Sequence, residues 1–154
     1  MVLTELLKAN TILAELGQPD KWTLIERLVD LLIDSGKAVD RATLLDAILS
    51  REKLASTGLG NGIAIPHART DGVHEVAVAL GISPSGLDFD AADGKPCHLV
   101  FLIVSPPEAS IRYLEALAAV ASLGEQPALV GQLKSAKTVD DVLASFRLYR
   151  EQNE

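Results

Sequence analysis

The side chain best suited to chemistry in this sequence is a histidine that follows a glycine-rich segment. Three glycines fall within residues 58–62, and a short apolar run, residues 63–65, then leads to Pro66 and His67. The apolar run is typical of a buried strand, and proline, which has no N–H to donate to a sheet, belongs at its end. We therefore expect His67 just beyond a rigid strand. An imidazole changes charge near neutral pH, so this position is a candidate for nucleophilic chemistry.

The backbone before His67 is a candidate anion-binding loop. Oriented backbone N–H groups bind phosphate, and glycine lets them approach it closely. The residues concerned are Ser56, Thr57, Gly58, Gly60 and Gly62. No Gly-Lys-Ser/Thr follows, which excludes a P-loop, and a strand rather than a helix follows, which excludes a dinucleotide-binding fingerprint. A tight turn with unusual backbone angles is compatible with the same residues.

The segments around His67 carry a family signature. Residues 51–58 read Arg-Glu-Lys-Leu-Ala-Ser-Thr-Gly, and residues 65–67 are Ile-Pro-His. With these motifs the chain resembles the fructose/mannitol-type EIIA domains (EIIA type 2) of the bacterial phosphoenolpyruvate:sugar phosphotransferase system, a group that includes the nitrogen-regulatory branch. The similarity extends over roughly the whole chain, through residues 87–96, 99–102 and 114–118.

The resemblance implies roles for two side chains. His67 corresponds to the residue that accepts a phosphoryl group, on Nε2. A histidine suits this role, because a neutral imidazole nitrogen is a good nucleophile and its phosphoramidate passes the group onward. Arg51 corresponds to the arginine whose guanidinium holds phosphoryl oxygens. From residue type alone, Arg51 is better explained as a solvated cation that favours the dipole of its helix.

The resemblance also implies partners. The phosphoryl donor is expected to be an HPr- or NPr-like histidine phosphocarrier protein. The receiver is expected to be the cysteine of an EIIB domain, or a regulatory protein that responds to the phosphorylation state. No cofactor is expected. The 154 residues contain no EIIB or membrane EIIC segment, so we expect other chains to carry out any sugar transport.

Tyr113 departs from the family pattern. Many members carry a second histidine here, in a His-Leu sequence that opens the helix facing the site, whereas this chain has Tyr113 and Leu114. A phenol can donate a hydrogen bond to phosphate, but it carries no positive charge near neutrality. The neighbouring Arg112 is a candidate to supply that charge.

Two other functions are compatible with the sequence. Tyr113 is also compatible with a degenerate EIIA-like interaction module that has little or no phosphotransfer. A hydrolase with a nucleophilic histidine is a weak hypothesis. No serine or cysteine lies in a nucleophile motif, and the sequence pairs no acid with His67.

No metal site is predicted. The spacing of His74 and His98 matches no ligand pattern, and one cysteine cannot build a typical structural zinc site. Asp88, Asp90 and Asp93 do not match an EF-hand loop, which would need an oxygen ligand in place of Ala92 and a glycine at the next position. A polar turn between strands explains these carboxylates better.

Composition excludes several classes of protein. The formal charge of −7 argues against a general nucleic-acid binder, which needs clustered lysine and arginine. Cys97 is the only cysteine, so no disulfide forms within the chain, which fits a reducing compartment. The N-terminus does not resemble a signal peptide, and the longest apolar run, residues 99–104, is too short to cross a bilayer. We expect a cytoplasmic protein without membrane insertion.

The helices and strands expected to position these residues intermix along the chain, without strict alternation. Helices are expected from Asp20 to residue 35 and from Asp40 to near Lys53, each with its aspartate as N-cap. Strands are expected at residues 76–82 and 97–104. A helix should span residues 105–124, and two closing helices are expected at 127–133 and 138–146. Thr138 and Asp141 resemble a capping box at the start of the last helix.

This pattern predicts an α/β domain with a central sheet. The family resemblance specifies a three-layer α/β/α sandwich on a small mixed sheet, and the length favours a single domain over residues 1–154. In the helix expected at 105–124, apolar residues with helical spacing are predicted to share one face. Its members are Ile111, Leu114, Leu117, Ala118 and Ala121.

Overall fold

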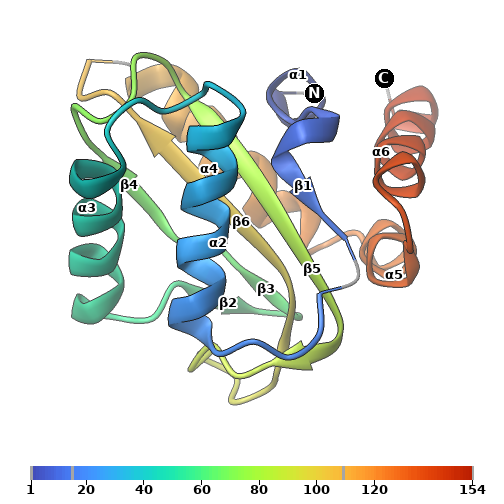
Figure 1. Cartoon of the computed structure of the whole chain (residues 1–154). Helices are drawn as coiled ribbons and strands as arrows, with labels where there is room; N and C mark the ends of the chain where they lie inside the picture. Colours follow the sequence, from blue (N-terminus) through green and yellow to red (C-terminus); the bar gives the residue numbers. More distant parts are fainter. Residues whose placement is uncertain (1, 15, 109, 154) are drawn as a thin grey trace.

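The computed structural model describes residues 2–14, 16–108 and 110–153, in which one sheet separates two sets of helices (Figure 1). The strands are β1 (Ile12–Leu13), β2 (Gly58–Gly60), β3 (Ile63–Ala64), β4 (His67–Arg69), β5 (Ala77–Leu87) and β6 (Cys97–Ser105). The helices are α1 (Val2–Leu6), α2 (Lys21–Asp34), α3 (Arg41–Leu54), α4 (Ser110–Leu123), α5 (Pro127–Ser135) and α6 (Val139–Asn153), with a 3-10 turn at Ala9–Thr11. Among the residues described, no helix is long and apolar enough to span a membrane.

The two long strands, β5 and β6, pair antiparallel at the centre of the sheet. β1 adds parallel to β5 on one side, while β3 and β4 add parallel to β6 on the other. β2 completes that side by antiparallel pairing with β3. The sheet is therefore mixed, as predicted, in the order β1-β5-β6-β3-β2.

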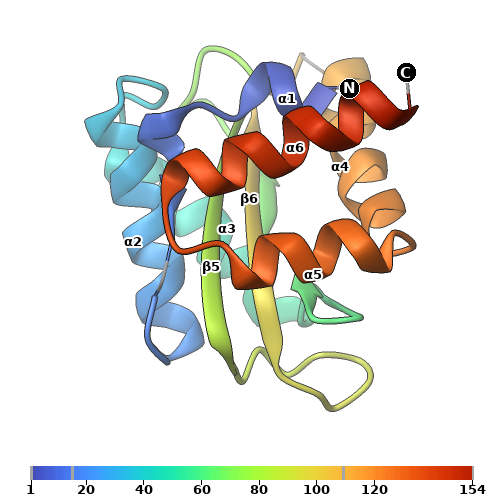
Figure 2. The ribbon, with the colours of Figure 1, turned by 90° about the vertical axis from the view of Figure 1, so that its right-hand side faces the viewer.

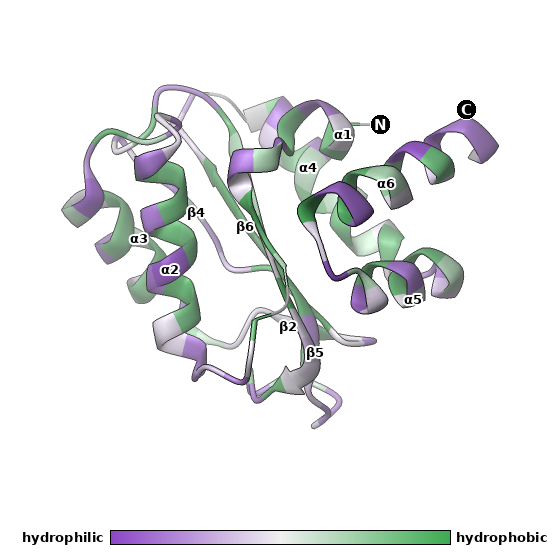
Figure 3. Ribbon diagram, turned by 45° about the vertical axis from the view of Figure 1, so that its right-hand side comes forward, coloured by the Kyte–Doolittle hydropathy of each residue, from purple (hydrophilic) through white to green (hydrophobic). Residues whose placement is uncertain are grey.

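Helices α2 and α3 cover one face of the sheet, and α1, α4, α5 and α6 cover the other (Figure 1, Figure 2). Alternate residues of β6 enter two hydrophobic clusters. Phe101 and Ile103 pack in the cluster that includes α4, α5 and α6, whereas Val100 and Leu102 pack with α2 and α3. Because both faces are buried, β6 is a nearly continuous apolar run, drawn as a green strand in Figure 3. The predicted three-layer α/β/α fold is confirmed.

The single cysteine lies at the start of β6, in the cluster that packs against α2 and α3. Cys97 is fully buried. Burial raises the pKa of its thiol to about 11, and the nearby carboxylates of Asp93 and Asp88 act in the same direction. The side chain therefore stays a neutral thiol at physiological pH.

Local capping interactions begin the helices where the sequence predicts them. Asp20 and Asp40 each accept a hydrogen bond from a backbone N–H in the first turn of α2 and α3, at 3.0 and 3.1 Å. Thr138 and Asp141 form the predicted reciprocal capping box before α6: each side chain accepts from the other residue's N–H. These bonds satisfy N–H groups that a helix leaves without partners in its first turn.

Several boundaries differ from the prediction. The strand predicted at 76–82 continues to Leu87 in β5, with an irregular register opposite β6. The last helix continues beyond Phe146 to Asn153. α4 begins at Ser110 rather than at residue 105, because β6 extends to Ser105 and a turn at residues 107–108 follows.

The apolar face predicted on α4 is mostly exposed, and of its members only Leu117 packs, partly buried, against the core. Ile111 and Leu114 expose 76% and 55% of their surface. The residues of α4 that pack in the hydrophobic cluster are Tyr113, Ala116, Val120 and Leu123. The helix is apolar around much of its circumference, and both stripes have helical spacing, so periodicity alone cannot choose between them.

Leucines on opposite sides of α4 test this assignment. We expect Leu123→Ala to lower the free energy of unfolding by about 2–5 kcal/mol, because it removes buried methyl groups and leaves a cavity. Leu114→Ala, on the exposed side of the same helix, should change it by less than about 0.5 kcal/mol. Urea unfolding followed by circular dichroism measures both values. Similar losses in the two variants would contradict the assigned face.

Candidate functional site

A break in strand pairing positions His67. β3 and β4 lie one after the other along the same edge of β6, with Ile65 and Pro66 between them. Pro66 has no N–H to donate, although its carbonyl accepts from the Ile103 N–H at 3.0 Å. His67 then resumes pairing opposite Ile103. The histidine therefore opens a second short strand, rather than lying beyond the end of one as the sequence suggested.

A hydrogen bond to a nearby carbonyl fixes the imidazole of His67. Its Nδ1 lies 2.7 Å from the carbonyl oxygen of Ile65, two residues earlier. A carbonyl only accepts hydrogen bonds, so Nδ1 carries the proton in the bonded neutral ring. The lone pair is then on Nε2. The half-buried side chain thus presents one defined nucleophilic nitrogen.

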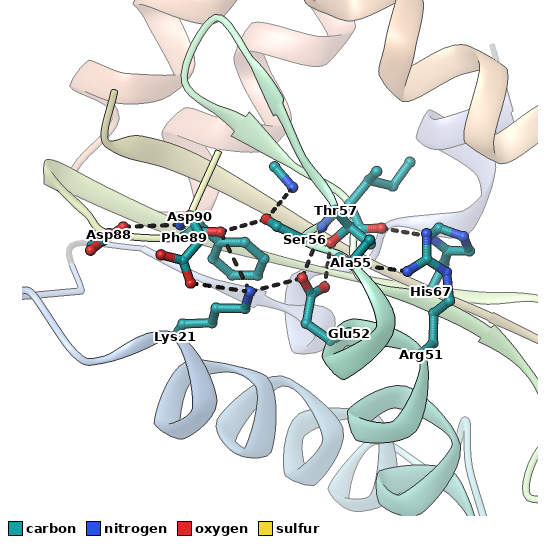
Figure 4. Close-up of polar contacts among 12 residues, drawn as sticks. Lys21, Arg51, Glu52, Ala55, Ser56, Thr57, His67, Asp88, Phe89 and Asp90 are labelled. Carbon is teal, nitrogen blue, oxygen red and sulfur yellow. Dashed lines mark hydrogen bonds and ion pairs between the residues drawn. The ribbon is translucent and has the colours of Figure 1, made fainter. Parts of the chain in front are cut away.

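Arg51 reaches the site from the last turn of α3. Its Nη1 donates to the carbonyl oxygen of Ala55, at 3.0 Å, just beyond the end of that helix. Figure 4 shows the Arg51 and His67 side chains at the same end of the polar network. Arg51 therefore bonds a carbonyl at the end of its helix, and its positive charge lies at the same end of the network as His67.

Tyr113 enters the site from α4. Its ring centroid lies 6.3 Å from that of His67, with the two planes tilted by 53°. Burial raises the pKa of Tyr113, and the positive charges of Arg69 and Arg51 act against this rise. The side chain is therefore a neutral phenol at physiological pH.

Arg69 is a site residue that the sequence interpretation missed. Its guanidinium carbon lies 5.3 Å from the centroid of the Tyr113 ring. Arg112, the cation suggested from the sequence, instead pairs with Glu5 of α1 at 2.7 Å. The available signal was strand alternation, because side chains two residues apart in a strand face the same way. His67 and Arg69 have this spacing in β4.

The start of the glycine-rich segment is held by internal hydrogen bonds. The buried carboxylate of Glu52 accepts from the backbone N–H of Thr57 at 2.8 Å, and from its hydroxyl at 2.5 Å. The Ser56 hydroxyl donates to the Phe89 carbonyl at 2.6 Å and accepts from the Gly58 N–H at 3.1 Å. The predicted donation to phosphate from the Thr57 and Gly58 amides therefore finds no support, because both already have partners.

Gly60 and Gly62 serve a turn away from His67. Both have positive φ angles, 99° and 79°, in the tight connection from β2 to β3. Along β6, the partner of Ile63 precedes the partner of His67 by four residues, which corresponds to about 13 Å. The structure does not bring these glycines to the imidazole, and the turn explanation accounts for them.

A buried ion pair, which the sequence analysis did not anticipate, anchors this loop. Nζ of Lys21 lies 2.9 Å from Oε2 of Glu52, and both side chains are almost fully buried. The ammonium also lies over the rings of Phe89 and Trp22, at 4.8 and 5.0 Å from their centroids. Figure 4 shows this network joining the start of α2, the end of α3 and the loop before His67.

Among the residues that the structure describes, no group of three or more histidine, cysteine or carboxylate side chains is placed to hold a metal ion. His74 is exposed, and Nδ1 of His98 lies 3.1 Å from two backbone carbonyls, those of Ser83 and Pro84. Asp88 and Asp93 each accept a hydrogen bond from a backbone N–H two residues later. These carboxylates form turns, as predicted.

The comparison with known families agrees with this geometry. The model for "Phosphoenolpyruvate-dependent sugar phosphotransferase system, EIIA 2" matches residues 5–148. The chain belongs to this family. The family assignment made from the motifs around Arg51 and His67 is thus confirmed.

Relatives of this EIIA chain have fructose-specific and nitrogen-regulatory names. It is 40% identical over 143 residues to the fructose-specific EIIABC component of Bacillus subtilis, covering 93% of this chain but only 22% of that protein. It is 46% identical to the fructose-specific EIIA component of Haloferax volcanii, covering 78% and 80% of the two chains. The crystal structure of nitrogen regulatory protein IIA-Ntr from Neisseria meningitidis superposes with a TM-score of 0.84 at 32% identity, over 94% and 99% of the chains.

The tautomer of His67 gives a direct test of the geometry. We expect the neutral ring to carry its proton on Nδ1, because this nitrogen donates to the Ile65 carbonyl. Nitrogen-15 NMR of the labelled side chain distinguishes the two ring nitrogens. Exposed His74 is the internal control and should show the mixture of tautomers found in a free histidine side chain. A dominant Nε2–H form of His67 would contradict the assignment.

Breaking the buried ion pair is expected to destabilise the fold. We expect Glu52→Ala to lower the free energy of unfolding by about 3–5 kcal/mol, because it leaves the Lys21 ammonium buried without its counter-charge. Arg41→Ala breaks the half-exposed pair with Asp30, and we expect a loss of at most about 1 kcal/mol. Chemical denaturation of the two variants tests the difference. Equal losses would show that the buried pair has no special role.

Proposed function

We propose that this EIIA chain is a phosphoryl carrier that accepts the group on Nε2 of His67. The observation that carries the proposal is the Nδ1–Ile65 hydrogen bond, because it leaves the nucleophilic lone pair on the other nitrogen. Proteins of this family are components of a phosphotransferase system, and we propose in addition that this chain forms a phosphohistidine intermediate. A single domain, residues 1–154, carries the site.

The transfer step balances without a cofactor. The Nε2 lone pair forms a bond to phosphorus as the bond from phosphorus to the donor nitrogen breaks, and that electron pair stays with the donor. No proton has to leave Nε2, because the ring proton is on Nδ1, bonded to the Ile65 carbonyl. Catalysis then consists mainly of in-line positioning and stabilisation of the charge on the phosphoryl oxygens.

Arg51 contributes to that stabilisation. A guanidinium group presents several N–H donors in one plane and can hold two phosphoryl oxygens. The bond to Ala55 uses one donor of Arg51 and fixes the side chain near His67. The remaining donors are then available to an anion on Nε2.

The partners follow from the chemistry and from the relatives. We propose an HPr- or NPr-like histidine phosphocarrier protein as donor, acting in the cytoplasm. The name of the Bacillus subtilis relative joins EIIA with B and C components, which supports an EIIB domain as one receiver. The nitrogen-regulatory name of the Neisseria structure supports a second use of the same site, signalling to regulatory proteins by its phosphorylation state.

The test is phosphoryl transfer from phosphoenolpyruvate through Enzyme I and a histidine phosphocarrier protein, followed by intact-mass measurement. We expect the wild type to gain one acid-labile phosphoryl group. His67→Ala should gain none, because it lacks the nucleophile. His74→Ala removes an exposed histidine outside the site and should behave as the wild type.

Two outcomes would contradict the proposal. One is a phosphoryl gain that persists in His67→Ala, and the other is no gain by the wild type with several phosphocarrier proteins. The second outcome would favour a binding module that has the fold without the relay. When the group is gained, adding a fructose-type EIIB domain tests the next step, since loss of the extra mass reports transfer to the EIIB cysteine.

A further inference from the structure

Arg69 and His67 lie on the same side of β4. Residues two apart in a strand face the same way, with Cα atoms about 6.6 Å apart. Ala68, between them, packs in the cluster with α2 and α3, so its neighbours face the opposite layer, where Tyr113 of α4 is buried. The long stem of an arginine allows its guanidinium to reach the space beside the neighbouring imidazole.

Tyr113 holds the guanidinium of Arg69 on this side. The separation of 5.3 Å from the ring centroid lies within the range of about 6 Å for a cation–π contact. The ring is 5% exposed and packs in the core, so its own position is fixed. The same ring lies 6.3 Å from the His67 ring, centroid to centroid. One rigid aromatic side chain therefore contacts Arg69 and also lies close to the His67 ring.

The charge of Arg69 is available to an anion. The ion pairs formed within residues 2–14, 16–108 and 110–153 involve Lys21, Arg41 and Arg112 and include neither Arg69 nor Arg51. Arg69 is exposed to solvent. Two guanidinium groups thus stand near His67 without a carboxylate to neutralise them.

We propose that Arg69 binds the phosphoryl group carried by His67, and that Tyr113 is the residue that positions Arg69 for it. This inference rests on the proposed function and adds a second cationic group to the site. A phosphoryl group places negatively charged oxygens beside Nε2, and Arg51 and Arg69 can both bind these oxygens through charge-assisted hydrogen bonds. Tyr113 is neutral and Arg112 is bound to Glu5, so the additional charge comes from Arg69.

The first experiment measures the rate of transfer from a phosphorylated histidine phosphocarrier protein to His67 by rapid quench. We expect Arg69→Ala to lower the rate by about ten- to hundredfold, the usual effect of losing a hydrogen bond to a charged group. Arg69→Lys keeps the charge without the fork and should recover part of the loss. Arg112→Ala, a matched control outside the site, should leave the rate unchanged. Equal rates in Arg69→Ala and Arg112→Ala would overturn the proposal.

The second experiment tests the positioning role of Tyr113. Tyr113→Phe keeps the ring and should retain the wild-type rate, whereas Tyr113→Leu removes the ring and should lower the rate as far as Arg69→Ala does. The double variant Arg69→Ala/Tyr113→Leu should be no slower than Arg69→Ala alone, since one residue acts through the other. A slow Tyr113→Phe variant, or additive losses in the double variant, would overturn this role.

A binding measurement separates failure of this inference from failure of the relay. Titration with inorganic phosphate, followed by the NMR signals of the His67 ring, reports the anion site without any transfer. We expect weaker binding to Arg69→Ala than to Arg112→Ala, even if no phosphocarrier protein phosphorylates the wild type. Equal binding by the two variants, beside normal phosphorylation of the wild type, would overturn the role of Arg69 and leave the proposed function intact.

Discussion

The geometry of the site depends on one hydrogen bond, between the Ile65 carbonyl and Nδ1 of His67. β3 and β4 pair with β6 in the same register, and the pairing is interrupted between them at Ile65 and Pro66, which has no N–H to donate. Ile65, inside the interruption, directs its carbonyl to Nδ1 of His67. The tautomer, the free nitrogen and the direction of the imidazole all follow from this single local constraint. The long central strands provide the rigid frame against which it acts.

The buried pair of Lys21 and Glu52 constrains the other side of the site. Two charges removed from water need good geometry and further hydrogen bonds. Here Thr57 donates hydrogen bonds to Glu52, and the Lys21 ammonium lies over the rings of Phe89 and Trp22. Glu52 directly follows Arg51 in α3, so the network that holds the carboxylate also fixes the turn of helix that carries the guanidinium. Stability and the placement of the Arg51 guanidinium are therefore coupled through neighbouring residues.

Features set by a few neighbouring residues could be predicted, whereas those set by packing could not. Aspartate caps, the capping box at Thr138 and the apolar strands depend on local spacing, and the structure has them. The site motif located His67 and Arg51 by resemblance. The choice between two apolar stripes on α4 depends on the docking of the whole helix, which periodicity does not specify. Glu52, which pairs with Lys21, and Tyr113, which contacts Arg69, lie far from these cations in the sequence, so no local pattern reveals the contacts.

The burial of Cys97 has a consequence for the direction of a phosphoryl relay. With a thiol pKa of about 11, only about one molecule in ten thousand carries a thiolate at pH 7, and the cluster against α2 and α3 covers the sulfur. Cys97 also lies six residues before Ile103, the β6 partner of His67, which corresponds to about 20 Å. Burial and distance together therefore keep the one thiol of this chain from acting as an internal acceptor, so any phosphoryl group carried by His67 would have to pass to a second molecule.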